Sequence, residues 1–402
     1  MEATIKKSIT AYNPAANPTD GWHFIASPLV GSLAPTAVDN LVANPADDYD
    51  LYRFDPSAAT EWQNYKNPAH TEGFRLENGK GYLYANANGC TLKFTGSTQP
   101  YVASANTVSL DDGWNLIGNP YPHNVYASQS YYAINAEKNN LSAEIGSETA
   151  IPPCTGIMVQ KENALAVTFS KTAPQTNRQG SITIKVGPSD AWVDKAIVSF
   201  NEGERLGKYV FNDAQAQLYI RQDGKDYAIV SVGKDVARNV STMPVNFKAK
   251  HNGEYTVTVN PEGVEMSYLH LIDNLTGEDI DLLGSGDCGF SPAITAERRG
   301  YTFEAKTTDD ESRFMLVFST NGAGSSTSSE TFAYYANGEI VIMADALANA
   351  SDASLQIVDV MGRILICRDA ARHVSTTGMA PGVYVLRLIH SDKVRTQKII
   401  IP

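Results

Sequence analysis

The chain has 402 residues, which is too long for one ordinary domain and corresponds to two or three domains of about 150 residues each. Hydrophobic residues make up 43% of the chain, so each domain can build a core. The formal net charge of −12 repels phosphate backbones and anionic lipid surfaces, and no apolar run is long enough to span a membrane. We therefore expect neither a nucleic-acid partner nor a membrane-spanning protein.

Short strands separated by turn signals dominate the chain. Apolar and polar residues alternate in runs such as Ser181–Val186, Gln217–Arg221 and Glu254–Asn260, as half-buried strands require. Asn-Pro dipeptides begin at residues 13, 17, 44, 67, 119 and 260, and they mark turns. We predict one helix, Thr36–Asn44, with Thr36 as its cap. The sequence therefore predicts an all-β fold.

The N-terminal third contains an internal duplication. Three blocks recur in the same order: Gly21–Leu29 returns as Gly113–Tyr121, Leu51–Asp55 as Tyr131–Asn135, and Gly81–Thr95 as Gly156–Ser170. Two loosely spaced copies disfavour a solenoid or propeller, which needs three or more regular repeats. We predict one pseudo-symmetric β domain over residues 1–174, with repeats at about 21–96 and 113–171. Trp22 and Trp114 open the same phrase, so we expect them in equivalent, largely buried positions related by a pseudo-two-fold axis.

Two further domains follow, each after a polar connection. A patternless stretch at 171–180 precedes a second β-sandwich at 181–320, and a Gly/Ser-rich linker at 321–329 precedes a C-terminal domain at 330–402. We expect the C-terminal domain to be a sandwich of about seven strands, and a chain that ends near Asn321 to stay folded. Period-two alternation predicts that Tyr384, Leu386 and Leu388 point inward while Val385 and Arg387 point outward.

The C-terminal domain resembles the sorting domain of proteins exported by the type IX secretion system of Bacteroidetes (the Por secretion tail). The resemblance rests on the phrases Leu355–Arg363, Pro381–Arg387 and Thr396–Ile401. Its motif residues here are Gly362, Pro381, Gly382, Tyr384 and Lys398. Gly362 lies between two strands, where we expect a turn with positive φ.

Two other phrases carry weaker resemblances. Gly113–Tyr121 is similar to a module common in large secreted Bacteroidetes proteins, and phrases between residues 253 and 318 look like the β-sandwich that often precedes such sorting domains. Together these resemblances imply an Ig-like C-terminal sandwich, export to the outer surface or the medium, and the secretion machinery as a partner. Met1–Lys7 lacks the apolar core of a signal peptide, so for an exported protein we expect that the signal has been removed.

The candidate catalytic motifs have simpler interpretations. Gly284–Gly289 matches the GxGxxG pattern of dinucleotide-binding loops. Such a loop links a strand to a helix, and the surroundings here are predicted to be β. Cys288 as a nucleophile would need His270 or His251 as a base within hydrogen-bond reach, and no pattern places them together. The seven histidines form no metal-binding pair, and Cys90, Cys154, Cys288 and Cys367 are scattered, which favours free thiols over a zinc site or a disulfide framework. We expect no catalytic centre and no cofactor.

Two kinds of ligand site remain open. Asp47, Asp48 and Asp50 are candidate calcium ligands, because calcium binds carboxylate oxygens. The alternative is a solvated turn, which the absence of an EF-hand loop favours. The second kind is a glycan-binding surface made of aromatic rings. The alternative is that these rings simply pack in strands and in the core. Its candidate residues are aromatic side chains among loop residues of the two repeats: Tyr49, Tyr52, Trp62, Tyr65, Tyr121 and Tyr126.

The sequence as a whole favours an exported or cell-surface binding or adhesion-type protein without its own catalytic centre. Its C-terminal domain is expected to act as the secretion or attachment signal, and glycans or a cell-surface protein are the expected ligands. One alternative is a carbohydrate-binding module protein, which would show exposed, coplanar aromatic rings in a shallow groove. A second alternative is a hydrolase or a hydrolase accessory protein, which would show convergent acids or a Ser/Cys–His pair in a deep pocket.

Overall fold

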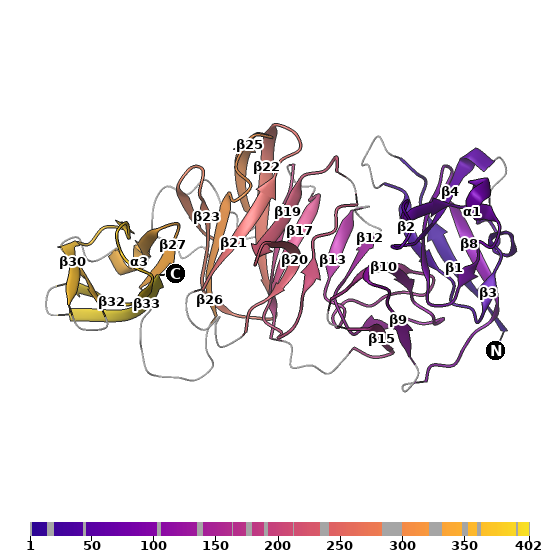
Figure 1. Cartoon of the computed structure of the whole chain (residues 1–402), viewed down its shortest axis with the longest axis horizontal. Coiled ribbons are helices and arrows are strands. Elements are labelled where there is room, and N and C mark those ends of the chain that lie inside the picture. The colour runs from indigo at the N-terminus through magenta and orange to yellow at the C-terminus, as the bar shows by residue number, and fades with distance from the viewer. Residues whose placement is uncertain are drawn as a thin grey trace. The chain divides into compact units, whose positions relative to one another are not determined.

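The structure is a computed structural model, and nearly all of its regular structure is β strand (Figure 1). The all-β fold class predicted from the sequence is confirmed. In the described part of the chain, the helical elements are single turns: η1 (Pro35–Ala37), η2 (Ala46–Asp48), α1 (Pro68–Thr71) and α3 (Ala344–Leu347). Among the described residues, no helix is long and apolar enough to cross a membrane. The residues described are 2–13, 20–42, 46–102, 106–134, 140–162, 164–173, 179–188, 192–211, 213–233, 241–283, 300–320, 332–347, 353–359, 363–390 and 393–401.

The chain forms two compact units. The first consists of Met1–Ser231, Asn246–Glu262 and Gly300–Glu311, and the second of Val232–Val245, Gly263–Arg299 and Ser312–Pro402. The domain boundaries indicated by the sequence, near residues 174, 181 and 320, do not coincide with this division. They stay predictions about which parts of the chain fold autonomously.

The first half of the N-terminal domain is built on a four-stranded sheet that packs against smaller sheets. The four-stranded sheet has the order β2 (Trp22–Ala26), β7 (Gly81–Asn86), β4 (Tyr49–Phe54) and β5 (Trp62–Asn64). The smaller sheets pair β1 (Glu2–Ile9) with β8 (Cys90–Ser97), and β3 (Ser32–Leu33) with β6 (Leu76–Glu77). Their core holds fully buried side chains such as Ile25, Leu51 and Phe94.

The second half repeats this strand order. Its four-stranded sheet runs β10 (Gly113–Gly118), β14 (Gly156–Lys161), β12 (Tyr131–Ile134) and β13 (Leu141–Glu144). Its smaller sheet runs β11 (Tyr126–Ala127), β15 (Ala166–Ser170) and β9 (Thr107–Ser109). Each strand of the β10 sheet occupies the place of the aligned strand in the β2 sheet, so the duplication in the sequence is also present in the strand order.

Reciprocal backbone contacts join the two halves. Ile25 forms a bridge with Thr155, and the equivalent Ile117 forms one with Lys80. The amide of Ala26 donates to the carbonyl of Cys154 at 3.2 Å, and the amide of Gly118 donates to the carbonyl of Gly79 at 3.0 Å. Gly79 and its counterpart Cys154 both have positive φ, 82° and 57°. This exchange of equivalent contacts is the pattern of a pseudo-two-fold axis.

A third, larger sheet completes the first unit. Within the unit its order is β19 (Gln217–Gln222), β20 (Lys225–Ser231), β17 (Asp194–Ser199), β16 (Ser181–Gly187), β22 (Gly253–Glu262) and β25 (Gly300–Ala305), with β18 (Leu206–Gly207) on β20. The strand β21 (Ser241–Lys248) crosses the unit boundary. Its residues up to Val245 pair with β26 (Phe314–Thr320), and its residues from Asn246 pair with β19.

The second unit contains a seven-stranded C-terminal sandwich beside β23, β24 and β26. β23 (Met266–Asp273) pairs with both β24 (Glu278–Asp281) and β26. One layer of the sandwich is β27 (Ala333–Ala336), β28 (Glu339–Ile342) and β31 (His373–Ser375), and the other is β30 (Ile364–Asp369), β29 (Ser354–Asp359), β32 (Gly382–His390) and β33 (Lys393–Ile401). Along β32, Tyr384, Leu386 and Leu388 are buried and Arg387 is exposed, as the alternation predicts, whereas Val385 is half-buried.

Two expectations are corrected and one falls outside the described residues. The helix Thr36–Asn44 is wrong: within the described residues 36–42 only the 3-10 turn Pro35–Ala37 forms, because Asp39 pairs with the backbone of Lys93 and Asn40 has φ 65°. Trp22 and Trp114 are equivalent, but they are half-buried rather than largely buried, because both rings lie beside one hydrophobic cluster rather than within it. Gly362 is not among the described residues.

Candidate functional site

One face of the β2-β7-β4-β5 sheet carries a row of aromatic side chains that packs against a buried cluster containing Phe24 and Leu83. Side chains two residues apart on a strand share a face, so Tyr52 and Phe54 of β4 lie together. The register places Trp62 of β5 opposite Phe54. The ring of Trp22 on β2 lies 5.9 Å from that of Tyr52. We call Trp22, Tyr52, Phe54 and Trp62 the aromatic strip, and all four side chains are half-buried.

Ring contacts hold the aromatic strip in place. The rings of Phe54 and Trp62 lie 4.9 Å apart at 61°, and those of Tyr12 and Trp22 lie 5.6 Å apart at 72°, which are favourable edge-on arrangements. Tyr12 extends the row and is 37% exposed. At the other end, the ring of Phe211 lies 6.0 Å from Trp62. Because strands rather than loops carry the strip, its rings are preorganised.

A polar group adjoins the aromatic strip on the same face. Asp50 lies two residues before Tyr52, and Asn64 is the cross-strand partner of Tyr52. The Nδ2 of Asn64 donates to Asp50 Oδ1 at 3.0 Å, and the Nζ of Lys66 lies 2.9 Å from the same oxygen. All three side chains are half-buried. This polar group, Asp50, Asn64 and Lys66, therefore offers hydrogen-bond donors and acceptors beside the rings.

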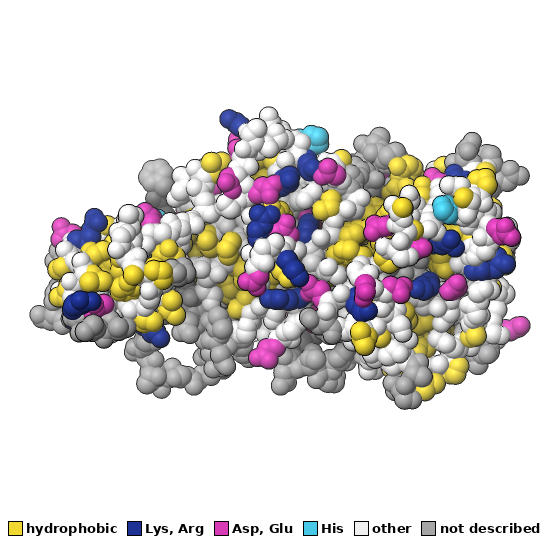
Figure 2. Space-filling model, viewed as in Figure 1, with side chains coloured by type: hydrophobic (Ala, Val, Ile, Leu, Met, Phe, Trp, Pro, Cys, Tyr) yellow, Lys and Arg dark blue, Asp and Glu magenta, His cyan; other side chains and the backbone are white. Residues whose placement is uncertain are grey.

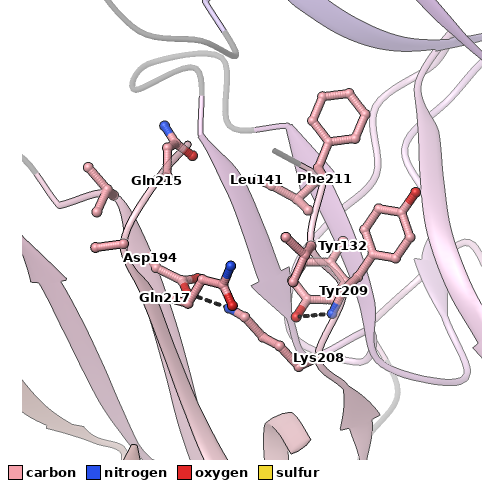
Figure 3. Close-up of a pocket in the computed structure, with 11 residues that line it drawn as sticks. Tyr132, Leu141, Asp194, Lys208, Tyr209, Phe211, Gln215 and Gln217 are labelled. Atoms are coloured by element: carbon pink, nitrogen blue, oxygen red, sulfur yellow. Dashed lines mark hydrogen bonds and ion pairs between the residues drawn. The ribbon is translucent and has the colours of Figure 1, made fainter. Parts of the chain in front are cut away.

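The equivalent face of the second half is covered by the chain that follows it. Trp114 and Tyr132 correspond to Trp22 and Tyr52, and their rings lie 6.0 Å apart. Here the ring of Tyr209 lies 4.8 Å from Trp114, and its amide donates to the Tyr132 hydroxyl at 3.2 Å (Figure 3). Burial raises the pKa of Tyr132 well above its usual value. This face is a packing surface.

The pocket drawn in Figure 3 belongs to that covered face. Its volume is about 30 Å³, which is room for one or two waters. Lys208 extends across it to form an ion pair with Asp194, and their side chains are only 7% and 10% exposed. Asp194 Oδ2 also accepts a hydrogen bond from the amide of Leu218 at 2.6 Å. Paired charges and a small volume make this pocket a structural junction.

A wider cleft of about 300 Å³ lies where the first half meets β10. Three basic and three acidic side chains line it: Arg53, Arg75, Lys80, Asp55, Glu77 and Asp111. The Nε of Arg53 donates to Gln63 Oε1 at 2.7 Å, and the Nζ of Lys80 lies 4.0 Å from Asp111 Oδ2. Phe54 lines this cleft as well as belonging to the aromatic strip. The cleft is thus polar and charge-balanced, and Phe54 is the only residue that it shares with the strip.

The structure separates the six aromatic residues proposed from the sequence. Tyr52 and Trp62 lie together in the aromatic strip. Tyr49 and Tyr121 are 4% and 1% exposed, so their rings belong to the cores of the two halves and are not a ligand surface. Tyr65 is half-buried and packs against the first core, and Tyr126 is half-buried on β11. Trp22 and Phe54 also belong to the strip but were not predicted from the sequence. For Trp22 the reason is that a Gly-Trp phrase at the start of a strand indicates a buried ring.

Of the three aspartates proposed for calcium, the two whose side chains are described do not point to a common site. Lys66 forms an ion pair with Asp50, and Asn88 Nδ2 donates to Asp48 Oδ2 at 3.1 Å. The side chain of Asp47 lies outside the described residues. Among the described residues, no three His, Cys, Asp or Glu side chains are grouped to hold a metal ion.

The motif residues of the C-terminal sandwich lie around a surface hollow. Pro381, Gly382 and Tyr384 line it together with the side chains of Leu365 and Met379. Leu365 is 46% exposed. Hydrophobic side chains also gather over this sandwich on the face seen in Figure 2. Lys398 lies apart from the hollow on β33, as the cross-strand partner of Val385.

Of the two candidate catalytic bases, His270 is held between two aspartates and His251 is exposed. His270 Nδ1 lies 2.6 Å from Asp279 Oδ1, and its Nε2 lies 3.8 Å from Asp281 Oδ1. Burial raises the pKa of the Cys154 thiol to about 12, so it is not a thiolate nucleophile at neutral pH. Cys288 and the segment Gly284–Gly289 lie outside the described residues.

Cys90, Cys154 and Cys367 are free thiols; Cys90 is half-buried and Cys367 exposed. The chain matches no family model, no curated protein and no solved structure.

Proposed function

We propose that the chain is an exported binding protein of the outer cell surface, and that its C-terminal sandwich is the secretion or attachment signal. The observation that carries this proposal is the surface hollow. Three of the five residues that resemble a sorting motif, Pro381, Gly382 and Tyr384, line one concave surface. A signal that other proteins read must present residues at the surface. Pro381 is exposed and Gly382 half-buried, while the buried Tyr384 holds this turn through the hydrogen bond that its hydroxyl donates to the carbonyl of Ala380 at 2.6 Å.

The proposed role in binding rather than catalysis is supported by the polar group beside the aromatic strip. The side chains of Lys66 and Asp50 are 28% and 38% exposed and stand on rigid strands and the turn after them, which suits contact with a ligand. The described histidine that resembles a catalytic base, His270, is instead fixed between Asp279 and Asp281.

Deletion of residues 330–402 in the native host tests the proposal. We expect the shortened protein to stay in the periplasm while its ligand-binding properties in vitro are retained. Cell fractionation and protease shaving of intact cells measure this. Surface display of the deleted form at the full level would contradict the proposal.

A pair of point variants localises the signal within the sandwich. Leu365 and Ile400 are both exposed, at 46% and 60%, but only Leu365 lines the hollow. We expect Leu365→Glu to retain the protein in the periplasm and Ile400→Glu to leave export unchanged. Equal export of both variants would show that the hollow is not what the partner recognises.

A further inference from the structure

The polar cleft where the first half meets β10 can be compared, residue by residue, with the equivalent place in the second half. The correspondence is fixed by contacts that equivalent residues make in both halves. These contacts are the strand pairings Leu33–Leu76 and Val125–Ile151, and the hydrogen bonds from the amides of Thr10 and Asp111 to the side chains of His23 and Asn115. The alignment of the two halves therefore holds for the segments that line the cleft.

The second half has no charge at any of the six positions that are charged in the cleft. The three basic residues Arg53, Arg75 and Lys80 correspond to Ala133, Ala150 and Thr155. The three acidic residues Asp55, Glu77 and Asp111 correspond to Asn135, Pro152 and Thr10. The same fold thus forms without these charges, so packing does not require them. Polar side chains that converge on a cleft without serving the core indicate a ligand site.

In the second half, a side chain of β1 extends into the equivalent junction. Lys7 corresponds to Val108 of β9, because their cross-strand partners Leu92 and Val167 are equivalent. The Nζ of Lys7 donates to Thr155 Oγ1 at 2.9 Å, and burial lowers the pKa of Lys7 to about 8, so the amine is enclosed there. A valine has no such arm, and on the side of Val108 a cleft of about 300 Å³ remains.

The cleft holds charges of both signs that are not paired with one another. Arg53 Nε donates to Gln63 Oε1 at 2.7 Å, and Arg75 Nη1 donates to the carbonyl of Phe74 at 3.2 Å. Both acceptors are uncharged. Within the described part of the chain, Arg53, Arg75 and Glu77 form no ion pair. The cleft therefore offers two guanidinium groups and one carboxylate to a ligand.

We infer that this cleft binds a zwitterionic ligand of the amino-acid class, either a free amino acid or a short peptide. This inference rests on the proposed function, since it names the ligand class of the binding protein. Arg53 and Arg75 hold the carboxylate of the ligand, because a guanidinium presents paired N–H donors that match two carboxylate oxygens. Glu77 accepts hydrogen bonds from the ammonium group. Three acidic and three basic side chains favour a ligand with both charges over a simple anion or cation.

Isothermal titration calorimetry of the full chain with L-alanine and with tri-L-alanine tests the inference. Both probes carry an ammonium and a carboxylate group near neutral pH, but only the tripeptide holds them far apart. The two probes therefore distinguish a free amino acid from a peptide. We expect at least one of them to bind. Binding of neither would overturn the inference.

Capped forms of the probe that binds show whether both charges are recognised. The N-acetylated form lacks the ammonium charge, and the C-amidated form lacks the carboxylate charge. We expect each to bind at least tenfold more weakly than the zwitterion, because each loses one charge-assisted contact. Equal affinity of the capped and uncapped forms would overturn the inference.

Variants that copy the second half localise the binding. Arg75→Ala installs the side chain of Ala150 and removes one guanidinium from an exposed residue. We expect it to weaken binding of the zwitterion at least tenfold. Lys93→Thr is the matched control, because it copies Thr168 in the same way but lies outside the cleft, and its affinity should stay within twofold of the parent. Unchanged affinity of the Arg75→Ala chain would overturn the inference.

A cross between variants and capped probes assigns each end of the ligand. Glu77→Gln should weaken binding of the zwitterion but not of its N-acetylated form, which has no ammonium for Glu77 to accept. Arg75→Ala should weaken binding of the zwitterion but not of its amidated form. Losses of equal size for capped and uncapped probes would mean that these side chains support only the fold, and would overturn the inference.

Failure of this inference is distinguishable from failure of the proposed function. The Arg75→Ala chain should reach the cell surface at the level of the parent chain, because it leaves the C-terminal sandwich intact. A surface-displayed parent chain that binds neither L-alanine nor tri-L-alanine defeats the zwitterion site alone. A chain that binds one of them but needs no residue of 330–402 for export defeats the proposed function alone.

Discussion

Ala26 and Gly118 occupy equivalent positions in the two halves and meet across the pseudo-two-fold axis. A Cβ built on Gly118 would lie 2.2 Å from the Cβ of Ala26 and 2.7 Å from the carbonyl oxygen of Lys80. Only one methyl group therefore fits between the halves at this point. Gly118, the second glycine of the phrase Gly113–Tyr121, is required because the other half approaches closely, and not because of its own backbone conformation.

Replacing Gly118 by Ala should destabilise the first unit by about 1–3 kcal/mol, because neither the backbone of Lys80 nor Ala26 can move without separating the halves. Urea unfolding measures this change. Ala26→Gly in the same chain should recover part of the loss by removing the nearer clash. Gly382→Ala is the control, since its Cβ would meet only the Tyr384 ring at 3.9 Å. Equal stability of the Gly118→Ala chain and the parent would contradict the close contact.

The part of the fold that can be predicted from the sequence is the part that the alternation of apolar and polar residues specifies. The alternation identifies the strands and the repeated blocks, and equivalent blocks take equivalent places in two sheets because the same faces need burial. It does not tell how the chain that follows packs on each sheet face. Trp22 and Trp114 open the same phrase, yet the ring of Tyr209 packs on Trp114, whereas the ring of Phe211 packs on Phe24 and Trp62. That difference depends on contacts between segments far apart in the chain.

Part of the candidate site could be predicted from the same alternation. Tyr49 and Tyr52 are three residues apart on one strand, so they lie on opposite faces, and only one of them can belong to a ligand surface. The contribution of Trp22 could not be predicted, because it depends on how β2 and β4 are arranged around β7. The place of Lys66 beside Asp50 also depends on the turn after β5, which no motif specifies.

His23 should make the free energy of unfolding of the chain depend on pH in the acidic range. Burial, followed by the nearby charge of Lys7, lowers the pKa of His23 to about 4. The amide of Thr10 donates to His23 Nε2 at 3.1 Å, and that nitrogen can accept only while it is unprotonated. Between the unfolded value near 6.5 and the folded value near 4, the unfolded chain binds more protons, so stability falls as the pH falls through this window.

The loss attributable to His23 should reach about 3 kcal/mol at pH 4 and grow no further below it. Urea unfolding between pH 4 and 7 measures it. His23→Asn copies the equivalent Asn115 and should remove this component of the pH dependence. Lys7→Met should raise the pKa of His23 in an NMR titration, because it removes the neighbouring positive charge. A His23 pKa near 6.5 in the parent chain would refute the buried, neutral state.

The ion pair of Asp273 and Arg313 should be critical for the second unit. Their side chains are 0% and 2% exposed, and Arg313 Nη2 lies 2.8 Å from Asp273 Oδ2. Asp273→Asn removes one charge of a buried, hydrogen-bonded ion pair, so we expect a loss of about 3–5 kcal/mol in urea unfolding. Asp226→Asn is the control, because its pair with Arg221 is exposed, and its cost should stay below about 1 kcal/mol. Similar costs for the two changes would contradict this role.

Removal of the C-terminal sandwich should destabilise the strands that precede it. The sequence predicts that a chain ending near Asn321 stays folded, but Met315 and Val317 of β26 are buried in one cluster with the sandwich residues. Tyr268 and Ile272 of β23 pack against the same cluster. A chain ending at Thr320 exposes all four side chains to water, which weakens β23 and β26 without touching the core of the first unit.

Hydrogen exchange distinguishes the two outcomes for this shortened chain. We expect the amides of β23 and β26 to exchange faster in the chain that ends at Thr320 than in the full chain, while the amides of β2 and β10 keep their protection. The shortened chain should also bind a hydrophobic dye through the face that it exposes. Unchanged protection along β26 would mean that the shared cluster adds no stability and that the sandwich is attached by its linker alone, as the sequence pattern indicates.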